Sequence, residues 1–447
     1  MHPNAWPFVA VLSTGVATSG CTETILDVDI QLLLPEDPTP LQAADNAHIT
    51  LAPDGISESI VIEGPEFTFN AELDPDTVER TLTVYLARQQ TLLGYGRTLP
   101  FQYAPAAAID LRVLIAYPGL LTTFPQAFDF PDPASLAASF DGHHVLVLGS
   151  TGAALFLDGH SYTFEAAASW PSTTPLPEPS DGVLLSEGRA IVTRLAWAEA
   201  LRALSFDLRE NAWIERPVLG DAAIGRTAAA FVHDPTQRVA WLLGGGERTD
   251  VARLDLAQPT AIPVGLEPAW ALDRPRRGAT AILAGAEVVV VGGDDPDVPR
   301  VHLPARGLAL GPVEDWRGLR CAPLDRDPVA TPRILCAGGL RDGAPTADAL
   351  LVELAATPAV THLPDFLPVP MPDPRWFEDD AALYAQSGAA WTRVDRGSLE
   401  RTDTAVPVGR AYGGATVDLA TGVTMLIGGT REDGSPANRW QIFAPTL

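Results

Sequence analysis

The sequence has no lysine and few positive charges of any kind. Its 447 residues include 30 basic residues, all of them arginine, against 56 Asp and Glu, so the formal net charge is -26. Nucleic acid presents dense negative charge and is bound by basic surfaces, so this composition argues against nucleic acid as a partner. It also argues against a polybasic membrane-binding patch, and it excludes a phosphate-binding P-loop, which requires a lysine.

The sequence also lacks an apolar run long enough to span a bilayer as a helix. From Trp6 to Ala17 the chain is uncharged and apolar or small, which is typical of the central region of a signal peptide. Small residues then lead to Cys21. This ending resembles a bacterial lipoprotein signal, which implies that residues 1–21 direct export and that Cys21 carries a lipid, the chain's only contact with a membrane. Two alternatives stay open, a plain secretory signal and an apolar first strand with a buried cysteine.

Cysteine is scarce, with three residues in the chain. If Cys21 carries lipid, Cys321 and Cys336 remain as an even pair on either side of a turn-rich stretch, 325–332. A hairpin over this stretch places the two cysteines opposite each other, within the Cα separation that a disulfide needs. An oxidising compartment favours the bridge. The alternative is two buried free thiols.

Residues 22–116 contain short strand patterns separated by turn signals. Apolar residues alternate with polar ones from Val28 to Leu32 and from Leu82 to Leu86. This density of strands predicts a β-sandwich of immunoglobulin-like architecture, acting as a spacer or docking module. The other predicted strands lie at 48–51, 59–62, 66–69, 92–95 and 109–115.

Residues 117–447 carry an internal repeat, marked by an apolar strand that runs into glycine. The copies recur about every 47 residues, with one degenerate copy in each of the two longer gaps. Seven units fill the region, or six if a weak copy is not a true repeat. The copies lie at Val145–Gly149, 189–193, Val239–Gly245, Val288–Gly293, Ile334–Gly339, 381–385 and Val423–Gly429.

An arginine precedes the glycines in several copies. Arg226 and Arg410 each stand 18 residues before the first glycine of their pair, and Arg276 is a variant with a shorter turn. This pattern resembles kelch repeats, in which one unit forms a four-stranded blade of a β-propeller. The resemblance implies an all-β chain, with a β-sandwich followed by a kelch-like propeller of seven or six blades. The last copy has room for three strands only, so we expect the segment 119–124 to supply its fourth.

Arginines that recur once per blade are candidates for lining the central channel: Arg226, Arg276, Arg320 and Arg410. In that position they would attract an acidic ligand. The alternative is that they form hydrogen bonds and ion pairs between blades, which repetition at a structural period favours.

Other polar clusters predict no catalytic or metal site. His143 and His144 are adjacent, so on a strand they point to opposite faces and do not ligate one ion easily with His160. The acidic runs 294–297 and 378–380 lack the spacing of a calcium loop and are predicted to be solvated. We expect no metal and no cofactor.

The sequence therefore predicts a monomeric, non-catalytic protein of the bacterial cell envelope, at the outer membrane, in the periplasm or on the cell surface. It would recognise a protein or a glycan through the loops on a propeller face. The alternative is a glycan-directed enzyme, lyase or mutarotase-like, with its site in the axial pocket.

Overall fold

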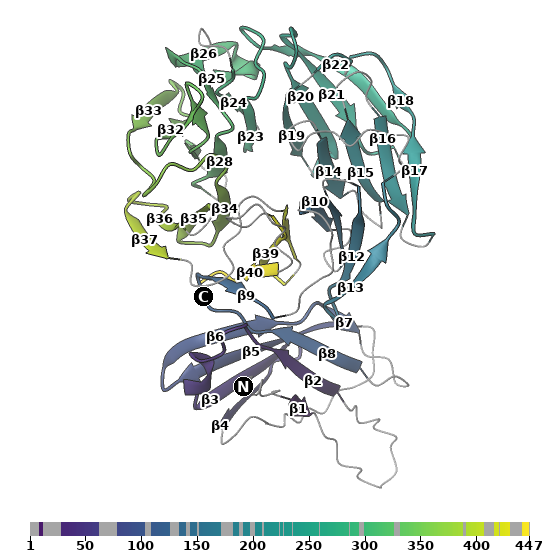
Figure 1. Cartoon of the computed structure of the whole chain (residues 1–447), viewed down its shortest axis with the longest axis vertical. Coiled ribbons are helices and arrows are strands. Elements are labelled where there is room, and N and C mark those ends of the chain that lie inside the picture. The colour runs from purple at the N-terminus through teal and green to yellow at the C-terminus, as the bar shows by residue number, and fades with distance from the viewer. Residues whose placement is uncertain are drawn as a thin grey trace.

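The computed structural model of this chain is built almost entirely from β-strands (Figure 1). Helical segments in the part that it describes are two short 3-10 turns, η1 (Leu41–Ala43) and η2 (Pro304–Arg306). No helix in that part has the length and apolar character to cross a bilayer. The described residues are 9–11, 28–61, 78–102, 109–125, 134–139, 144–149, 152–170, 182–186, 191–196, 202–207, 210–222, 224–226, 228–234, 236–258, 260–285, 287–294, 299–325, 331–387, 390–405, 415–419, 421–429 and 440–446.

The N-terminal domain consists of two packed sheets, as the strand patterns predict. One sheet has the order β1-β2-β8, and the other has the order β4-β3-β5-β6 with β7 paired to β5. Apolar side chains that alternate along these strands, such as Ile49, Val84 and Val113, meet in one buried cluster between the sheets. The strands are β1 (Val9–Val11), β2 (Val28–Leu33), β3 (Asn46–Ala52), β4 (Ile56–Val61), β5 (Glu79–Arg88), β6 (Thr91–Arg97), β7 (Phe101–Gln102) and β8 (Ile109–Leu114).

Strand β1 comes from the segment that the sequence predicts to be an export signal. It pairs antiparallel with β2, with Val9 opposite Gln31 and Val11 opposite Asp29. This pairing fits the alternative of an apolar first strand. Cys21, the predicted lipidation site, and the strand predicted at 66–69 lie outside the described residues.

Seven small antiparallel sheets follow in the described part of the chain, arranged around a central axis (Figure 1). Their number is the number of repeats that the sequence predicts, and both degenerate copies form second strands, β15 and β35. The sheets are β10 (Ala134–Ser139) to β13 (Thr163–Ala167); β14 (Gly182–Ser186) to β17 (Ala212–Arg216); β19 (Ala230–Asp234) to β22 (Ile262–Ala271), with β18 (Val218–Leu219) beside β22; β23 (Thr280–Ala284) to β26 (Leu308–Val313); β28 (Arg320–Pro323), β29 (Arg333–Ala337), β32 (Ala349–Glu353) and β33 (Ala359–Leu363); β34 (Arg375–Glu378) to β37 (Arg401–Ala405); and β38 (Ala415–Asp418) to β40 (Trp440–Phe443), with β9 (Leu121–Thr123). Between their outer members run β11 (His144–Gly149), β12 (Ala154–Asp158), β15 (Ile191–Ala196), β16 (Arg202–Asp207), β20 (Val239–Leu243), β21 (Asp250–Asp255), β24 (Glu287–Val291), β25 (Pro299–Leu303), β35 (Ala382–Ser387), β36 (Ala390–Asp395) and β39 (Thr424–Ile427).

The second strand of each well-marked repeat is buried on both faces. In β20 every residue is buried, and in β24 and β29 all but the first are buried. A strand covered on both faces needs apolar residues at consecutive positions, which explains the unbroken apolar runs of the sequence. Their side chains join buried clusters shared with a neighbouring sheet: Val289 and Ile334 belong to one cluster, and Leu335 and Leu383 to another.

The seventh sheet takes its fourth strand from the N-terminal side of the ring, as predicted. Strand β9 pairs antiparallel with β40, with Leu121 opposite Phe443 and Thr123 opposite Gln441. The side-chain amide of Gln441 also donates to the hydroxyl of Thr123 at 2.8 Å. One sheet therefore joins the two ends of the repeat region.

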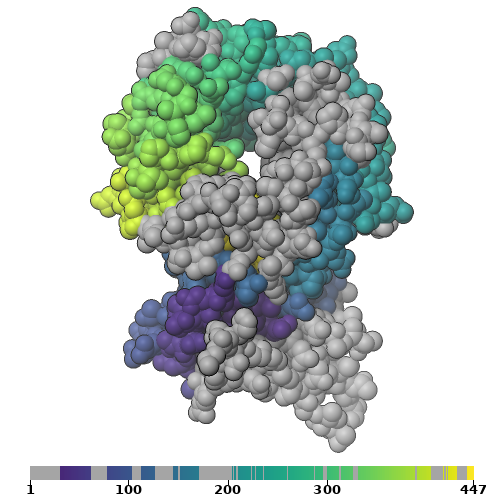
Figure 2. Space-filling model, in the orientation of Figure 1, coloured from purple at the N-terminus to yellow at the C-terminus, as the bar shows by residue number. Residues whose placement is uncertain are grey.

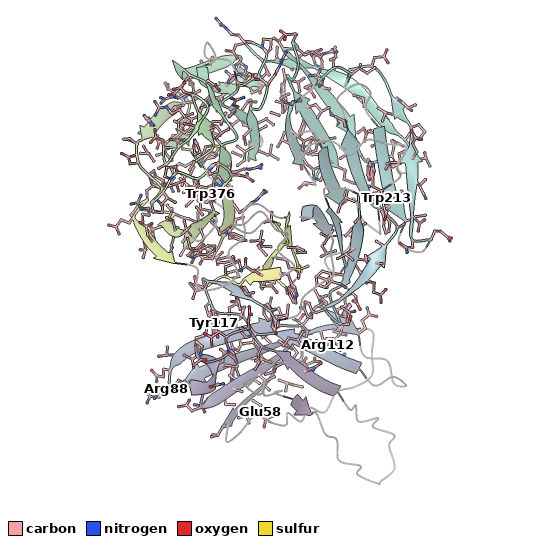
Figure 3. All side chains as sticks on the ribbon, viewed as in Figure 1. Glu58, Arg88, Arg112, Tyr117, Trp213 and Trp376 are labelled. Atoms are coloured by element: carbon pink, nitrogen blue, oxygen red, sulfur yellow. A yellow bond between two sulfur atoms is a disulfide. The ribbon has the colours of Figure 1, made fainter. Side chains whose placement is uncertain are left out.

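The N-terminal domain is docked directly onto the first and seventh sheets, near Arg112 and Tyr117 in Figure 3. The Arg112 guanidinium donates to the carbonyl oxygen of Ser161 at 2.6 Å. The Tyr95 hydroxyl donates to the carbonyl oxygen of Pro445 at 2.7 Å. Tyr95 also belongs to a buried apolar cluster that continues into the first and seventh sheets. The domain therefore packs directly against the ring.

Candidate ligand-binding face

Two of the predicted channel arginines are structural. Arg226 precedes β19, and its Nη1 donates to the carbonyl oxygens of Gly244 at 2.9 Å and Asp250 at 2.8 Å, while its Nη2 pairs with the Asp250 carboxylate. Arg276 precedes β23 in the same way, and its Nη1 donates to the carbonyl oxygen of Gly292 at 3.1 Å. Both side chains are 0% exposed. They do not line an open channel: each binds the carbonyl at the end of its sheet's second strand.

The glycine pairs let the backbone turn at the end of the second strand, close to the carbonyl group of a neighbouring segment. Gly292 has a φ of +74°, and a Cβ there would lie 2.0 Å from the carbonyl oxygen of Trp316. Gly338 has a φ of +68°, and a Cβ there would lie 2.4 Å from the carbonyl oxygen of Met371. Only glycine combines this backbone conformation with so close an approach. The arginines and glycines of the repeat therefore act together to end the second strand of a sheet.

In the fifth sheet a tryptophan takes the place of the structural arginine. Trp316 precedes β28 just as Arg226 precedes β19, and its indole Nε1 donates to the carbonyl oxygen of Gly338 at 2.7 Å. Its ring is 1% exposed, and the guanidinium carbons of Arg300 and Arg341 each lie 5.7 Å from its centroid. The repeat position held by Arg226 thus corresponds to Trp316 and not to Arg320, which has a different role.

Arg320 is the first residue of an innermost strand, and so is Arg375 in the next sheet. The central opening that these strands border is visible in Figure 2 beside the green residues of the fifth and sixth sheets. Trp376, which follows Arg375, lies on the inner side of the ring in Figure 3. In the other five sheets the first residue of the innermost strand is small: Ala134, Gly182, Ala230, Thr280 and Ala415.

The two arginines share one carboxylate. Arg320 Nε donates to Asp373 Oδ1 at 2.8 Å, and Arg375 Nη2 lies 3.1 Å from Asp373 Oδ2. The side chain of Arg320 is 47% exposed and that of Arg375 is 21% exposed. Arg375 Nε is buried and has no hydrogen-bond partner among the described residues. The group therefore has two cations, one anion and an unused donor.

A disulfide lies directly beside Arg320. Cys321 and Cys336 face each other across β28 and β29, their Cα atoms are 4.0 Å apart, and they are joined by a bridge. The predicted hairpin disulfide is confirmed. Because it links the innermost strand covalently to the buried second strand, it fixes the segment that carries Arg320.

A small extra sheet adds to the same end of the ring. It is formed by β27 (Trp316–Arg317), β30 (Leu340–Arg341) and β31 (Ala344–Pro345). Arg341 pairs with Glu314 and Asp348, and Asp348 also accepts a hydrogen bond from His362 at 2.9 Å. These pairs hold the loops of the fourth and fifth sheets in place.

We name this end of the ring the arginine face. Backbone hydrogen bonds join neighbouring sheets at this end: Gly318 N donates to the carbonyl oxygen of Gly278, and Gly339 N donates to that of Met371. We use the name for five of the described arginines, whose side chains are between 21% and 47% exposed and each pair with a carboxylate: Arg277, Arg317, Arg320, Arg341 and Arg375.

The described members of the histidine cluster, His144 and His160, do not form a metal site. His144 stacks on Phe156 and lies 3.9 Å from the Asp158 carboxylate, and the backbone N–H of His160 donates to the same carboxylate at 2.9 Å. His143 and Arg410 lie outside the described residues. Within the described ranges, no group of three or more His, Cys, Asp or Glu side chains is arranged to hold a metal ion.

One residue of each acidic run departs from the predicted solvated loop, whereas Glu378 and Asp380 are exposed as predicted and residues 295–297 lie outside the described residues. Asp294 is partly buried, and burial raises its pKa despite the opposing charges of Arg277 and Arg317. Asp379 is 0% exposed and accepts hydrogen bonds from the hydroxyls of Tyr384 at 2.7 Å and Thr446 at 2.5 Å. It is a structural anchor for the C-terminal segment, a role that acidic clustering in the sequence does not reveal.

Comparison with known proteins gives a likeness at low similarity. A solved structure described as "Structure of YjhT" aligns with 69% of this chain and 94% of its own chain, with a TM-score of 0.38 and 10% sequence identity. No family model matches the sequence. No curated protein matches it either.

Proposed function

We propose that this chain is a non-catalytic binding protein of the bacterial cell envelope that recognises a protein or glycan partner through the arginine face. The observation that carries the proposal is the presence of Arg320 and Arg375 at a position that is small in the other five sheets. Neither residue makes the glycine-carbonyl contact of the repeat. They do pair with Asp373 between the fifth and sixth sheets, but large, partly exposed charged groups at the mouth of the ring also suit recognition of a ligand.

The rigidity of this face supports binding. The extra sheet of β27, β30 and β31, the Trp316 contact and the disulfide all fix loops that would otherwise be long and mobile. A loop that is already ordered loses little conformational entropy when a partner binds. Guanidinium groups in fixed positions also suit partners with carboxylate, sulfate or hydroxyl groups.

The proposed location has its own support. The disulfide is typical of a protein that folds in an oxidising compartment outside the cytosol. The apolar segment from Trp6 to Ala17, with Cys21 after it, supports export with a lipid anchor.

The test is capture of a partner by the full chain carrying Cys21→Ser, immobilised and exposed to envelope extract and to a glycan array. We expect a retained protein or glycan that is lost when Arg277→Glu and Arg317→Glu are combined. The matched control combines Arg88→Glu and Arg401→Glu, two exposed arginines that are not among the five of this face, and should retain the partner. Equal capture by both double variants would refute the assignment of the face, and turnover of a captured glycan would refute the non-catalytic role.

A further inference from the structure

Two arginines share one carboxylate at Asp373, as Arg226 and Arg248 share that of Asp250. Of these two groups, only the one at Asp373 has a buried donor without a partner among the described residues, Arg375 Nε. The Arg341 guanidinium faces two carboxylates, and Arg277 faces the carboxylate of Glu247. By contrast, Arg320 and Arg375 face a single carboxylate between them. Two guanidinium groups close to one carboxylate leave one net positive charge at the mouth of the central opening.

We propose that Arg320, Asp373 and Arg375 form a subsite for an oxyanion group, a carboxylate or a sulfate, carried by the ligand. This inference rests on the proposed function, because it assigns the part of the ligand that meets the inner rim of the arginine face. The oxyanion would accept from the half-exposed guanidinium of Arg320 and from the part of the Arg375 side chain that solvent reaches. Hydrogen bonds from charged donors to an oxyanion are short and about twice as strong as neutral ones.

The environment of Arg375 makes an added anion favourable. Burial lowers the pKa of its guanidinium, Asp373 partly offsets this, and the charge of Arg320 lowers it further. The protonated form is therefore less well stabilised than it is in water. A second anion beside the two guanidinium groups would remove this imbalance.

The three side chains are held in position before any ligand arrives. Asp373 stands between Pro372 and Pro374, whose rings restrict the backbone on both sides. The residue before this segment, Met371, accepts a hydrogen bond from Gly339 N at 2.8 Å and donates one to Thr346 at 3.1 Å. With Arg320 fixed by the adjacent disulfide, the subsite resembles a preformed binding site and not a surface ion pair.

The experiment uses full-length protein labelled with 15N at arginine Nε, with sodium acetate and sodium sulfate as probes. Sodium chloride at the same ionic strength is the reference. We expect the Nε–H signals of Arg320 and Arg375 to shift saturably with acetate or sulfate and not with chloride. The two signals are assigned by their loss in Arg320→Gln and Arg375→Gln.

Variants separate the subsite from general ionic effects. Arg320→Gln, at a half-exposed position that should tolerate the change, is expected to abolish the shift at Arg375. Asp373→Asn removes the competing carboxylate and should tighten anion binding roughly tenfold. Arg401→Gln removes an exposed arginine that pairs with Asp403 on the outer strand of the same sheet, and should change nothing.

The proposal is overturned if acetate and sulfate shift these signals no more than chloride does, or if Arg320→Gln leaves the Arg375 shift intact. The acetate and sulfate arms show which oxyanion is preferred. If the anion shifts fail while partner capture still depends on Arg277 and Arg317, the subsite is wrong and the proposed function stands. If the shifts occur and capture fails, the proposed function is wrong and the subsite stands.

Discussion

Trp316 donates its indole hydrogen to the carbonyl oxygen of Gly338, as Arg226 and Arg276 donate theirs to the corresponding glycine carbonyls in their own sheets. One structural task is therefore performed by two kinds of side chain. Arg320 occupies a different position of the repeat, the start of the innermost strand, where it borders the central opening.

Replacing Trp316 by phenylalanine should lower the free energy of unfolding by about 2–4 kcal/mol. The change leaves the buried Gly338 carbonyl without its donor and removes part of a fully packed ring. Chemical denaturation measures the loss. Trp376→Phe is the control, because its Nε1 bond to the Arg320 carbonyl is reached by water, and it should lose about 1 kcal/mol or less. Equal losses in the two variants would contradict the role assigned to Trp316.

A pair of glycine substitutions in the fourth sheet tests the close approach at the strand end. Gly292→Ala should destabilise by more than about 4 kcal/mol, because its Cβ would overlap the Trp316 carbonyl oxygen. Gly285→Ala has a similar positive φ of +63° and open space around the Cβ, so it should lose about 1–2 kcal/mol. Thermal unfolding of the two variants gives the comparison. A smaller effect at Gly292 than at Gly285 would show that the sheets are not pressed together there.

Removing the disulfide by Cys321→Ala with Cys336→Ala should lower the free energy of unfolding by about 3 kcal/mol. The bridge closes a loop of 15 residues, and the unfolded chain gains the corresponding freedom. A reducing agent should destabilise the native chain to a similar degree and leave the double variant unaffected. A double variant that responds to the reductant as the native chain does would count against this bridge.

The anchor formed by Asp379 should make stability depend on pH. Burial would raise the pKa of its carboxyl, but hydrogen bonds from Thr446, Tyr384 and two backbone N–H groups prevail and lower it. The stabilisation is therefore complete above the unfolded pKa of about 3.9 and is lost as pH falls through the lower folded value. Asp379→Asn should be about 1.5–3 kcal/mol less stable than the native chain at pH 7.

This difference between Asp379→Asn and the native chain should shrink below about pH 4, and denaturation curves at several pH values would show it. Asp395→Asn is the control, since that carboxylate also accepts hydrogen bonds but these are exposed to solvent, so its loss should have a smaller effect. A difference that is constant from pH 7 to pH 3 would mean that Asp379 does not act through its charge.

Lipid attachment has a direct test. We expect the native chain to partition with membranes and Cys21→Ser to remain in the soluble fraction, because the anchor would be the only membrane contact. Partitioning is followed by fractionation of cells that express each form. Membrane association of Cys21→Ser would disprove the anchor.

The repeat could be predicted from the sequence because its physical causes are local. A strand buried on both faces must be apolar throughout, as in β24, and a strand end pressed against a neighbouring carbonyl must be glycine, as at Gly292. The fourth strand of the seventh sheet could be predicted from an unpaired edge, which the segment around Leu121 fills.

The candidate site could be predicted only in part. Arginine recurrence points to Arg320 but equates it with Arg226, because the sequence does not show that Trp316 performs the structural task. Arg375 could not be identified from the pattern, because the sixth repeat has no glycine pair by which to align it with the other repeats. The shared carboxylate of Asp373 depends on the approach of two sheets, which no local pattern encodes.

The pairing of β9 with β40 also constrains the order in which the molecule can be made. Thr123 and Gln441 bond across a sequence separation of 318 residues, and the chain is synthesised from its N-terminus. Strand β9 must therefore wait, unpaired, until β40 has emerged from the ribosome. If translation stops before the seventh repeat, the released protein has no seventh sheet between its first and sixth sheets. The ring can therefore close only after β40 has been synthesised.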